Sequence, residues 1–432
     1  MQSMEKLQFD VLVIGAGAAG LMAAWEIALT GRSVAIIEAK DRIGGRIFTN
    51  RDEVFSLPIE LGAEFVHGDL QLTQQLLKKA GAEIYKISGS IWQKKDGQIQ
   101  EQEDFIEDFS YLQKKFKELE EDIPVSQFLE QYLQGDKYEE LRFTLQNYVE
   151  GYYAADTNKA SIFALYEELT KSSDEQYRVE DGYLQLVNYL EQQCKEKDVQ
   201  FFLSQPVWQV HWKDSSVEAI TEKGNFSASK VLITVPVGVL QSDAITFFPA
   251  LPQVKQAAQH LGYGDIVKMI FQFEDAFWKD KALTNGKDLH NLNFLFSEEI
   301  IPTWWTQHPK KETILTCWLG GPKAAALRML GVEELTQKAL FSLGNIFGID
   351  VIHLHQKVKG VQFYNWSADP HFLGAYSYEV VNGKKYIKAL QQPVEQTIFF
   401  AGEGLHHGPE IGTVEAALIS GRDTAHRLIA SF

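Results

Sequence analysis

Three closely spaced glycines near the start of the chain predict a site that binds a dinucleotide. They follow the apolar run 9–14 in the order G-x-G-x-x-G, as Gly15, Gly17 and Gly20. The run predicts a buried strand, and the glycines let a pyrophosphate approach the N-terminus of the next helix, predicted over 21–30. A second strand, over 33–37, ends in Glu38, whose carboxylate is placed to accept a hydrogen bond from a ribose hydroxyl. The whole unit is more specific than glycines that merely shape a turn.

The residues after Glu38 favour a flavin over a nicotinamide. Gly44 and Gly45 let the backbone approach a ligand closely, and Arg46 brings a guanidinium fork suited to a pyrophosphate. Near the other end of the chain, the segment 399–404 predicts a strand that is followed by a helix opening at 412–417. The partial positive charge of that helix N-terminus suits the electron-rich edge of a reduced flavin.

A lysine in an apolar strand is the strongest candidate for redox chemistry. Lys268 shares one strand face with Ile266 and Ile270, which is a poor environment for an unpaired ammonium. For a generic sequence, an edge-strand lysine that reaches solvent is the alternative.

Together these motifs resemble the flavin-containing amine oxidase family, which includes monoamine and polyamine oxidases, histone demethylases and L-amino-acid oxidases. The resemblance covers nearly the whole chain. It is carried by 15–20, 44–46, 61–64, the strand of Lys268, 366–376 and 402–415.

The resemblance implies roles on the cofactor side. Glu38 is implied to hold the adenosine ribose, Arg46 the pyrophosphate and Glu403, after Gly402, the ribityl-diphosphate region. Gly62 and Ala63 are implied to line the flavin ring, with Glu64 beside them as a backbone contact; Thr413 and Val414 are implied to cap its pyrimidine edge. Val207 matches an adenine-side backbone contact, although a valine at the start of a short strand is usually a core residue.

The resemblance also implies roles on the substrate side. Lys268 is implied to bond a water against flavin N5, and Tyr376 to form one wall of an aromatic cage that steers an amine. Ala375 stands where monoamine oxidases carry the cysteine that binds their flavin, so we expect non-covalent FAD. Thr413 replaces a second cage tyrosine, which leaves the cage half open.

Two further side chains have both a functional and a structural interpretation. Trp366 is expected either to close another side of the cage or to lie in the core. His67 is expected either to face the substrate amines and tune binding across physiological pH, or to be hydrogen-bonded in a turn.

Positioning these residues requires a two-lobed α/β fold. We expect a discontinuous Rossmann-like FAD-binding lobe over 1–85, 195–254 and 366–432, here called the cofactor lobe. An inserted α+β substrate lobe is expected over 86–194 and 255–365, helical over 86–180. Within the insertion, the pattern predicts helices over 105–121, 127–150 and 332–347 and strands over 267–273 and 313–319.

Composition is consistent with this interpretation and excludes other classes. The chain has 432 residues, more than one core usually supports, and its net charge of −17 argues against nucleic acid as a partner. An acidic field concentrates protonated amines, although solubility alone also explains it. Two cysteines without metal-ligand spacing, no signal peptide and no membrane-spanning run lead us to expect a cytoplasmic protein, monomeric or homodimeric, without a metal.

The sequence therefore predicts an FAD-dependent enzyme that oxidises an amine and reduces O2 to H2O2. Alternatives are an L-amino-acid oxidase, a flavin desaturase or dehydrogenase for a lipid-like substrate, and a flavoprotein without enzymatic activity. The ring-lining loop 60–68 has no arginine for a substrate carboxylate, but Arg142, Arg178 and Arg328 remain candidates.

Overall fold

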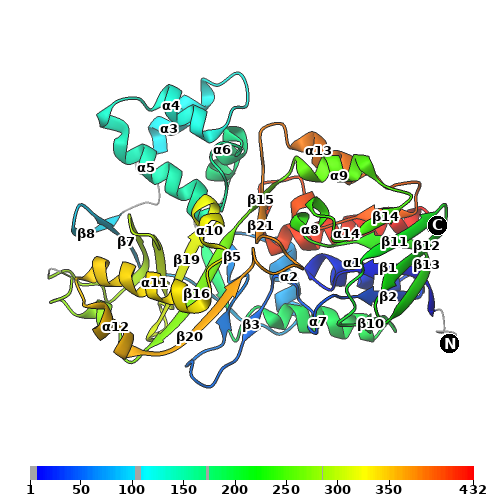
Figure 1. The fold of residues 1–432 in the computed structure, drawn as a ribbon, viewed down its shortest axis with the longest axis horizontal. Coiled ribbons are helices and arrows are strands. Elements are labelled where there is room, and N and C mark those ends of the chain that lie inside the picture. Colours follow the sequence, from blue (N-terminus) through cyan, green and yellow to red (C-terminus); the bar gives the residue numbers. More distant parts are fainter. Residues whose placement is uncertain (1–6, 103–108, 172–174, 285) are drawn as a thin grey trace.

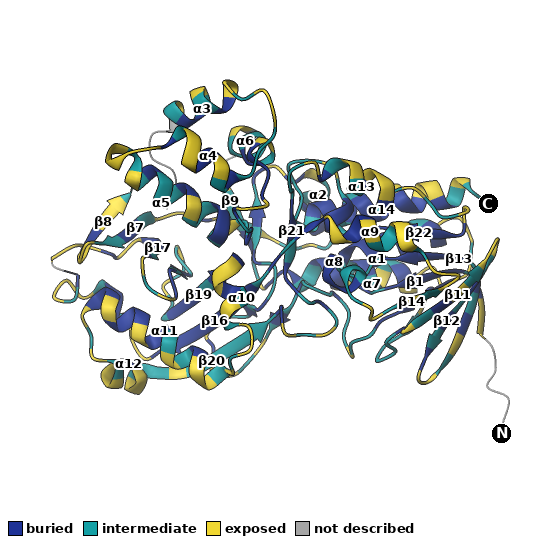
Figure 2. Ribbon diagram, turned by 45° about the horizontal axis from the view of Figure 1, so that its top comes forward, coloured by how far each residue is buried: buried dark blue, intermediate teal, exposed yellow. Residues whose placement is uncertain are grey.

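The chain folds into two lobes, which lie side by side in Figure 1. The computed structural model describes residues 7–102, 109–171, 175–284 and 286–432. In Figure 2, buried residues follow the sheets of both lobes and the helix faces packed on them, while exposed residues mark the outer helices. The predicted two-lobed α/β architecture is confirmed.

The cofactor lobe is built on a sheet with strand order β10-β2-β1-β13-β12-β11-β14, in which β22 also pairs with β13. Its strands are β1 (Leu7–Ile14), β2 (Val34–Ile37), β10 (Gln200–Phe202), β11 (Gln209–Lys213), β12 (Ser216–Thr221), β13 (Gly224–Ile233), β14 (Thr246–Phe248) and β22 (Ile398–Phe400). β1 lies between β2 and β13 and is parallel to both, so its nearly continuous apolar run is buried on two faces.

Helices cover both faces of this sheet. One face packs against α1 (Ala18–Ala28), α2 (Gln71–Lys79), α7 (Leu184–Lys195) and α14 (Val414–Ala430). The other packs against α8 (Val237–Gln241), α9 (Pro252–Gln259) and α13 (Lys384–Leu390).

Two of the expected lobe boundaries cut through helices of the cofactor lobe. The apolar residues of α7, such as Leu186 and Leu190, pack in one core with α1, so the expected boundary at 194/195 is wrong for this helix. α9 spans the expected boundary at 254/255, but Ala257 and Ala258 pack with the strands of the same lobe. Both helices use their apolar face against the large sheet, which the local pattern does not reveal.

The substrate lobe contains a second sheet, with strand order β20-β16-β19-β18-β17-β7-β8. Its strands are β7 (Ser90–Lys95), β8 (Gln98–Gln102), β16 (Ile266–Phe273), β17 (Leu292–Ser297), β18 (Thr303–Thr306), β19 (Ile314–Gly320) and β20 (Val358–Asn365). All eight residues of β16 are buried, and α11 (Val332–Phe347) packs against the sheet with α10 (Gly321–Leu327) and α12 (Val351–Lys357).

The predicted helical part, 86–180, begins as a β-hairpin instead. β7 and β8 pair across a turn at Asp96 and Gly97, both with positive φ. Helices follow as α3 (Phe109–Lys117), α4 (Val125–Tyr132), α5 (Glu139–Asn147) and α6 (Ile162–Lys171), with a π-helical turn at Tyr148–Tyr152. Residues 105–108 of the predicted helix 105–121 lie outside the described residues.

Short strands join the two lobes. They are β3 (Thr49–Asn50) with β4 (Ile59–Glu60), β5 (Phe65–His67) and β6 (Ile84–Lys86) with β9 (Gln176–Val179), and β15 (Gly262–Gly264) with β21 (Tyr376–Tyr378). Throughout the described part of the chain, no helix has the length and apolar character needed to cross a membrane.

Candidate active site

The N-terminus of α1 is built to receive an anion. Gly17 precedes the helix, no side chain caps it, and the first turn has no acidic residue, so its N–H groups are available. A Cβ on Gly20 would lie 2.0 Å from the carbonyl oxygen of Gly15, which shows how closely helix and strand approach. A Cβ on Gly17 would have no atom nearer than 3.9 Å. The second glycine pair faces this loop, with Gly17 bridging to Gly44.

Glu38 lies at the end of β2, beside the same loop. Its Oε2 accepts from the backbone N–H of Ala16 at 2.7 Å, and its Oε1 accepts from that of Lys40 at 2.8 Å. Burial raises the pKa of Glu38, although both backbone N–H groups oppose the shift. The carboxylate is therefore held where the motif places the ribose.

Arg46 and Glu403, predicted from opposite ends of the chain, meet as an ion pair. Arg46 Nη1 lies 2.6 Å from Glu403 Oε1 and donates also to the Ala375 carbonyl oxygen at 2.6 Å. Glu403 accepts in addition from the backbone N–H and the hydroxyl of Ser377. This contact joins the loop after β2, β21 and the segment before α14.

Gly402 and the start of α14 complete the cofactor side. Gly402 has φ of +152°, and a Cβ there would have no atom within 4 Å. Thr413 is the N-cap of α14, and its hydroxyl accepts from the backbone N–H of Ala416, so the helix opens at Val414 as expected.

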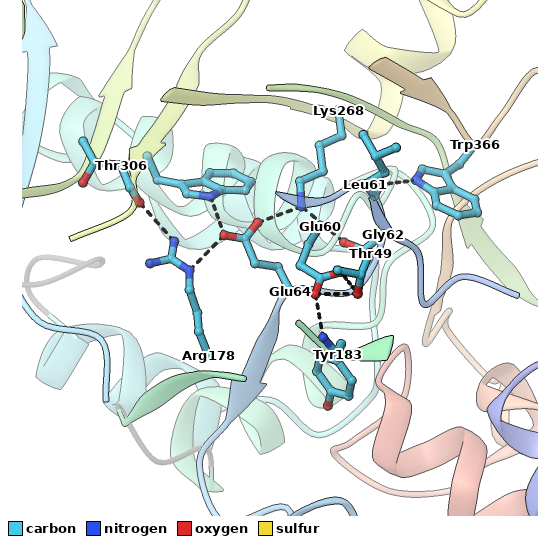
Figure 3. A network of polar contacts seen from close by, with 11 residues as sticks. Thr49, Glu60, Leu61, Gly62, Glu64, Arg178, Tyr183, Lys268, Thr306 and Trp366 are labelled. Atoms are coloured by element: carbon cyan, nitrogen blue, oxygen red, sulfur yellow. Dashed lines mark hydrogen bonds and ion pairs between the residues drawn. The ribbon is translucent and has the colours of Figure 1, made fainter. Parts of the chain in front are cut away.

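Lys268 is not a lone ammonium, because it forms a buried ion pair with Glu64 (Figure 3). The side chain of Lys268 is 1% exposed and that of Glu64 is 5% exposed. Lys268 Nζ lies 2.7 Å from Glu64 Oε2 and donates to the Gly62 carbonyl oxygen at 3.2 Å. Glu64 therefore contributes its carboxylate, not only the backbone contact that the resemblance implies.

Arg178 holds the other oxygen of Glu64. Its Nε lies 2.9 Å from Glu64 Oε1, which accepts also from Trp305 Nε1 at 3.1 Å. Burial by itself would raise the pKa of Glu64, but the Lys268 ammonium and the Arg178 guanidinium hold that pKa below its ordinary value. Arg178 donates further to the Thr306 carbonyl oxygen (Figure 3), so this guanidinium links β9 to the substrate-lobe sheet.

A second carboxyl, Glu60, lies beside this group. It accepts from the Tyr183 backbone N–H at 2.6 Å and from the Thr49 hydroxyl (Figure 3). Burial raises the pKa of Glu60 to about 7, and the nearby Lys268 opposes the shift.

An aromatic surface extends from Lys268. Its partner in the β16–β19 register is Trp318, whose ring stacks on Tyr376 with centroids 6.4 Å apart. The Tyr376 hydroxyl donates to the carbonyl oxygen of Tyr152, whose own hydroxyl lies 3.1 Å from His67 Nδ1. Tyr376 and His67 thus share Tyr152 as a partner, and their roles toward an amine stay a prediction.

Sequence reasoning missed Trp305, Trp318 and Tyr152. The two tryptophans alternate with core residues on strands, so periodicity alone does not separate them from the core. Tyr152 is presented by the π-helical turn, a conformation typical of functional sites but without a simple sequence signal.

The positions of the remaining candidates favour their structural interpretations. Trp366 is buried against Tyr364 and Phe372, and its Nε1 donates to the Leu61 carbonyl oxygen, so it supports the ring-lining loop from behind (Figure 3). Val207 packs in the core of the cofactor lobe, and its role beside adenine stays a prediction. Burial lowers the pKa of His67 to about 4, contrary to the expected titration near neutral pH.

A buried carboxyl that the described side chains satisfy only in part lies near the aromatic surface. Glu168 on α6 lines a hollow that Tyr153 and Pro409 also line. Its Oε1 accepts a long 3.4 Å bond from Tyr148, its Oε2 has no partner among the described residues, and burial raises its pKa to about 8. Tyr148 stacks on Tyr152 with centroids 5.1 Å apart, so this carboxyl adjoins the Tyr152–Tyr376 pair.

These residues fit FAD. The uncapped α1 N-terminus and the open space at Gly17 and Gly402 suit the pyrophosphate and the chain leading to the ring. Glu38 and Arg46 would hold the ribose and diphosphate, while Gly62 and the α14 N-terminus would border the ring. Cys194 packs in the apolar core of the cofactor lobe and Cys317 in that of the substrate lobe, which disfavours either thiol as a covalent partner of the ring.

Comparisons with known proteins agree with this geometry. The sequence profile described as "Flavin containing amine oxidoreductase" matches residues 18–96 and 88–429. The chain is 28% identical to Lysine-specific histone demethylase 2 of Homo sapiens over 460 residues, which cover 98% of this chain and 53% of that protein. It is 28% identical to Probable polyamine oxidase 4 of Arabidopsis thaliana over 465 residues, covering 98% of this chain and 87% of that protein. The chain thus spans about half the length of Lysine-specific histone demethylase 2.

Solved structures share the fold. A triple mutant of putrescine oxidase superposes with a TM-score of 0.80 at 22% identity, covering 99% of this chain and 100% of that chain. Cyclohexylamine oxidase from Brevibacterium oxydans gives a TM-score of 0.79 at 19% identity, covering 98% and 99%. The chain therefore belongs to the flavin-containing amine oxidoreductase family.

Proposed function

We propose that this enzyme oxidises a primary or secondary amine, a monoamine or a polyamine, to an imine that hydrolyses to an aldehyde. Oxygen is the proposed electron acceptor, and hydrogen peroxide the proposed second product. FAD, when bound, supplies the redox chemistry by accepting a hydride equivalent from the carbon next to the amine nitrogen. The protein supplies binding, orientation and charge.

One observation carries this proposal: the aromatic surface of Trp318, Tyr376 and Tyr152 lies between a buried ammonium and the carboxyl of Glu168, whose Oε2 has no partner in the described part of the chain. Aromatic faces attract a cation and also pack against the apolar chain of an amine. Glu168 offers a carboxyl group to an ammonium group at the same surface, and a bound cation would favour its ionised form. The relatives named polyamine oxidase and the structures named putrescine oxidase support the same substrate class.

Two of the three candidate arginines are bonded within the protein and the third is exposed at the end of a helix, which argues against an L-amino-acid oxidase. Arg178 is 4% exposed and bonds Glu64 and the Thr306 carbonyl oxygen. Arg142 donates to the carbonyl oxygens of Leu133 and Gly135, on the helical part of the substrate lobe. Arg328 is exposed at the end of α10.

An anaerobic reduction assay tests the proposal. Purified holoenzyme is mixed without oxygen with monoamines, diamines, polyamines and amino acids, and the loss of flavin absorbance is followed. We expect amines to bleach the flavin and matched amino acids, which add only a carboxylate, to leave it oxidised. Bleaching by an amino acid but not by its decarboxylated amine would instead assign an L-amino-acid oxidase.

The acceptor is tested separately, on enzyme reduced by the best amine. Admitting oxygen is expected to restore the absorbance and release one peroxide per flavin, and Lys268→Met is expected to slow this step. Slow peroxide formation that is indifferent to Lys268→Met would favour a dehydrogenase with another acceptor.

A further inference from the structure

Lys268 and its neighbours form a buried charge cluster that exceeds what cofactor binding requires. Lys268 and Arg178 each carry a positive charge, and Glu64 between them carries the negative charge that both contact. All three side chains are at most 5% exposed. Burying charges in this way is costly unless each is paired, so their geometry is tightly constrained.

We propose that Glu64 is a positioning residue that fixes the direction and the proton of the Lys268 ammonium, and that Arg178 keeps Glu64 ionised for this task. The electrostatic part of this inference stands by itself, and only its oxygen-reaction arm rests on the proposed function.

The hydrogen bonds fix the direction of the ammonium. Glu64 Oε1 is held by Arg178 and Trp305, so the carboxylate cannot rotate, and Oε2 remains for Lys268. Lys268 uses a second N–H on the Gly62 carbonyl oxygen, in the loop implied to line the flavin ring. An ammonium has three N–H donors, so two fixed bonds determine where the third points.

The charges fix the proton. A buried lysine without a partner loses its proton readily, because burial disfavours the charged form. A buried lysine–glutamate pair alone can also become neutral by passing one proton across. Arg178 prevents this, because a guanidinium stays charged and needs the Glu64 carboxylate as its own partner. The three groups therefore keep one net positive charge beside the ring-lining loop.

The titratable groups that face this cluster come from several elements. Glu60 on β4 contacts neither Lys268 nor Arg178 directly, but its charge acts on Lys268. Tyr85 on β6 faces Arg178 and Glu64. Neither replaces Glu64, so removing the Glu64 charge leaves Lys268 without a contacting carboxylate.

A double-mutant cycle tests the inference on loaded enzyme without amine or oxygen. The visible absorbance of bound FAD is titrated between about pH 6 and about pH 10 in wild type, Glu64→Gln, Lys268→Met and the double variant. We expect Glu64→Gln to show a one-proton transition, since Lys268 now deprotonates in this range. Glu60, whose pKa is about 7, is expected to titrate in all four proteins, and the additional transition of Lys268 is expected to be absent from wild type, from Lys268→Met and from the double variant. Its persistence in the double variant, or its absence from Glu64→Gln, would overturn the proposal.

The oxygen reaction provides a second readout. At the low end of the range, Glu64→Gln is expected to lose least in kcat/KM for oxygen, because Lys268 is still protonated there and only the direction of its ammonium is affected. At the high end it is expected to fall about tenfold or more, to the level of Lys268→Met, because each pKa unit below the working pH reduces the protonated fraction tenfold. The double variant should equal Lys268→Met throughout, and a further decrease would show that Glu64 acts independently of the lysine.

Two more variants separate positioning from stability. Glu64→Asp keeps the charge but shortens the side chain, so it is expected to slow the oxygen reaction without the additional pH transition. Asp350→Ala removes another carboxylate, one that caps the N-terminus of α12 and has no part in the site described above, and is expected to lower only the melting temperature. A purely structural role for Glu64 would make Glu64→Gln behave like Asp350→Ala in every assay.

Discussion

At the scale of single residues, the buried carboxyl of Glu168 destabilises the folded protein and is also proposed to bind the substrate ammonium. Burial raises its pKa to about 8, far above its ordinary value of 4.5. The folded state therefore keeps this proton up to about pH 8, whereas the unfolded chain loses it near pH 4.5. Between these two pH values the folded state binds one proton more than the unfolded chain. Raising the pH through this interval therefore lowers the free energy of unfolding. Such a trade is common where a site must accept a charged ligand.

Replacing Glu168 is thus expected to stabilise the protein and weaken binding. The free energy of unfolding of Glu168→Gln should exceed that of wild type by about 1 kcal/mol or more above about pH 8. Below about pH 5 the two free energies should be equal. The same variant should lose about tenfold or more in kcat/KM for its best amine. Denaturant unfolding at several pH values and steady-state kinetics check the two halves. Equal amine kinetics in both proteins would remove Glu168 from the proposed site.

At the scale of elements, two glycines of the βαβ unit are needed for different reasons, Gly20 for packing and Gly17 for FAD binding. A Cβ on Gly20 would collide with the Gly15 carbonyl at 2.0 Å, so Gly20→Ala is expected to destabilise even the FAD-free protein, by about 2 kcal/mol. A Cβ on Gly17 has room in the protein itself, with 3.9 Å to the nearest atom, but it would point into the path of a pyrophosphate. Gly17→Ala should therefore keep the melting temperature of the FAD-free protein and bind FAD about tenfold or more weakly. Calorimetry and FAD titration of both variants measure this difference. Equal losses of stability and of FAD affinity in the two variants would contradict it.

The same unit shows what a sequence can predict. Strand, glycines, helix and Glu38 are local in sequence, so their positions follow from hydrophobic periodicity and backbone sterics; β1, β2 and α11 lie where the pattern places them. The hairpin β7–β8 was missed, although its Asp96-Gly97 turn is a recognised signal. The packing of α7 on α1 depends on which of two apolar surfaces a helix chooses, and that choice is made by tertiary contact.

The site was predictable in part for the same reason. Lys268, Arg46 and Glu403 carry motifs, and the structure places Arg46 against Glu403. The partner of Lys268 was not predictable, because Glu64 is 204 residues away in sequence and Arg178 reaches the pair from β9. Long-range ion pairs of this kind leave no local pattern. The sequence left two interpretations of His67 open, because it does not report the burial that lowers the pKa of this side chain.

At the scale of the whole molecule, the cofactor lobe is assembled from separated stretches of chain. β1 and β2 come from the start, β13 from the middle, and β22 and α14 from the end, so no single stretch completes the FAD site. The Lys268–Glu64 pair and the Arg178–Thr306 bond connect this lobe to the substrate-lobe sheet. A ligand that contacts several of these stretches stabilises their joint arrangement only in the folded state.

FAD is therefore expected to stabilise both lobes together. Acid precipitation should release all the yellow colour into the supernatant, since no covalent bond retains it. FAD-free protein, prepared under milder conditions, should then melt in one transition, and adding FAD should raise its melting temperature. The free energy of unfolding should increase by about 2.7 kcal/mol when free FAD is 100 times its Kd. Calorimetry with and without FAD measures this shift. Colour retained in the pellet would contradict non-covalent binding. Two transitions, of which FAD moves only one, would show that the ion pairs between the lobes do not couple their unfolding.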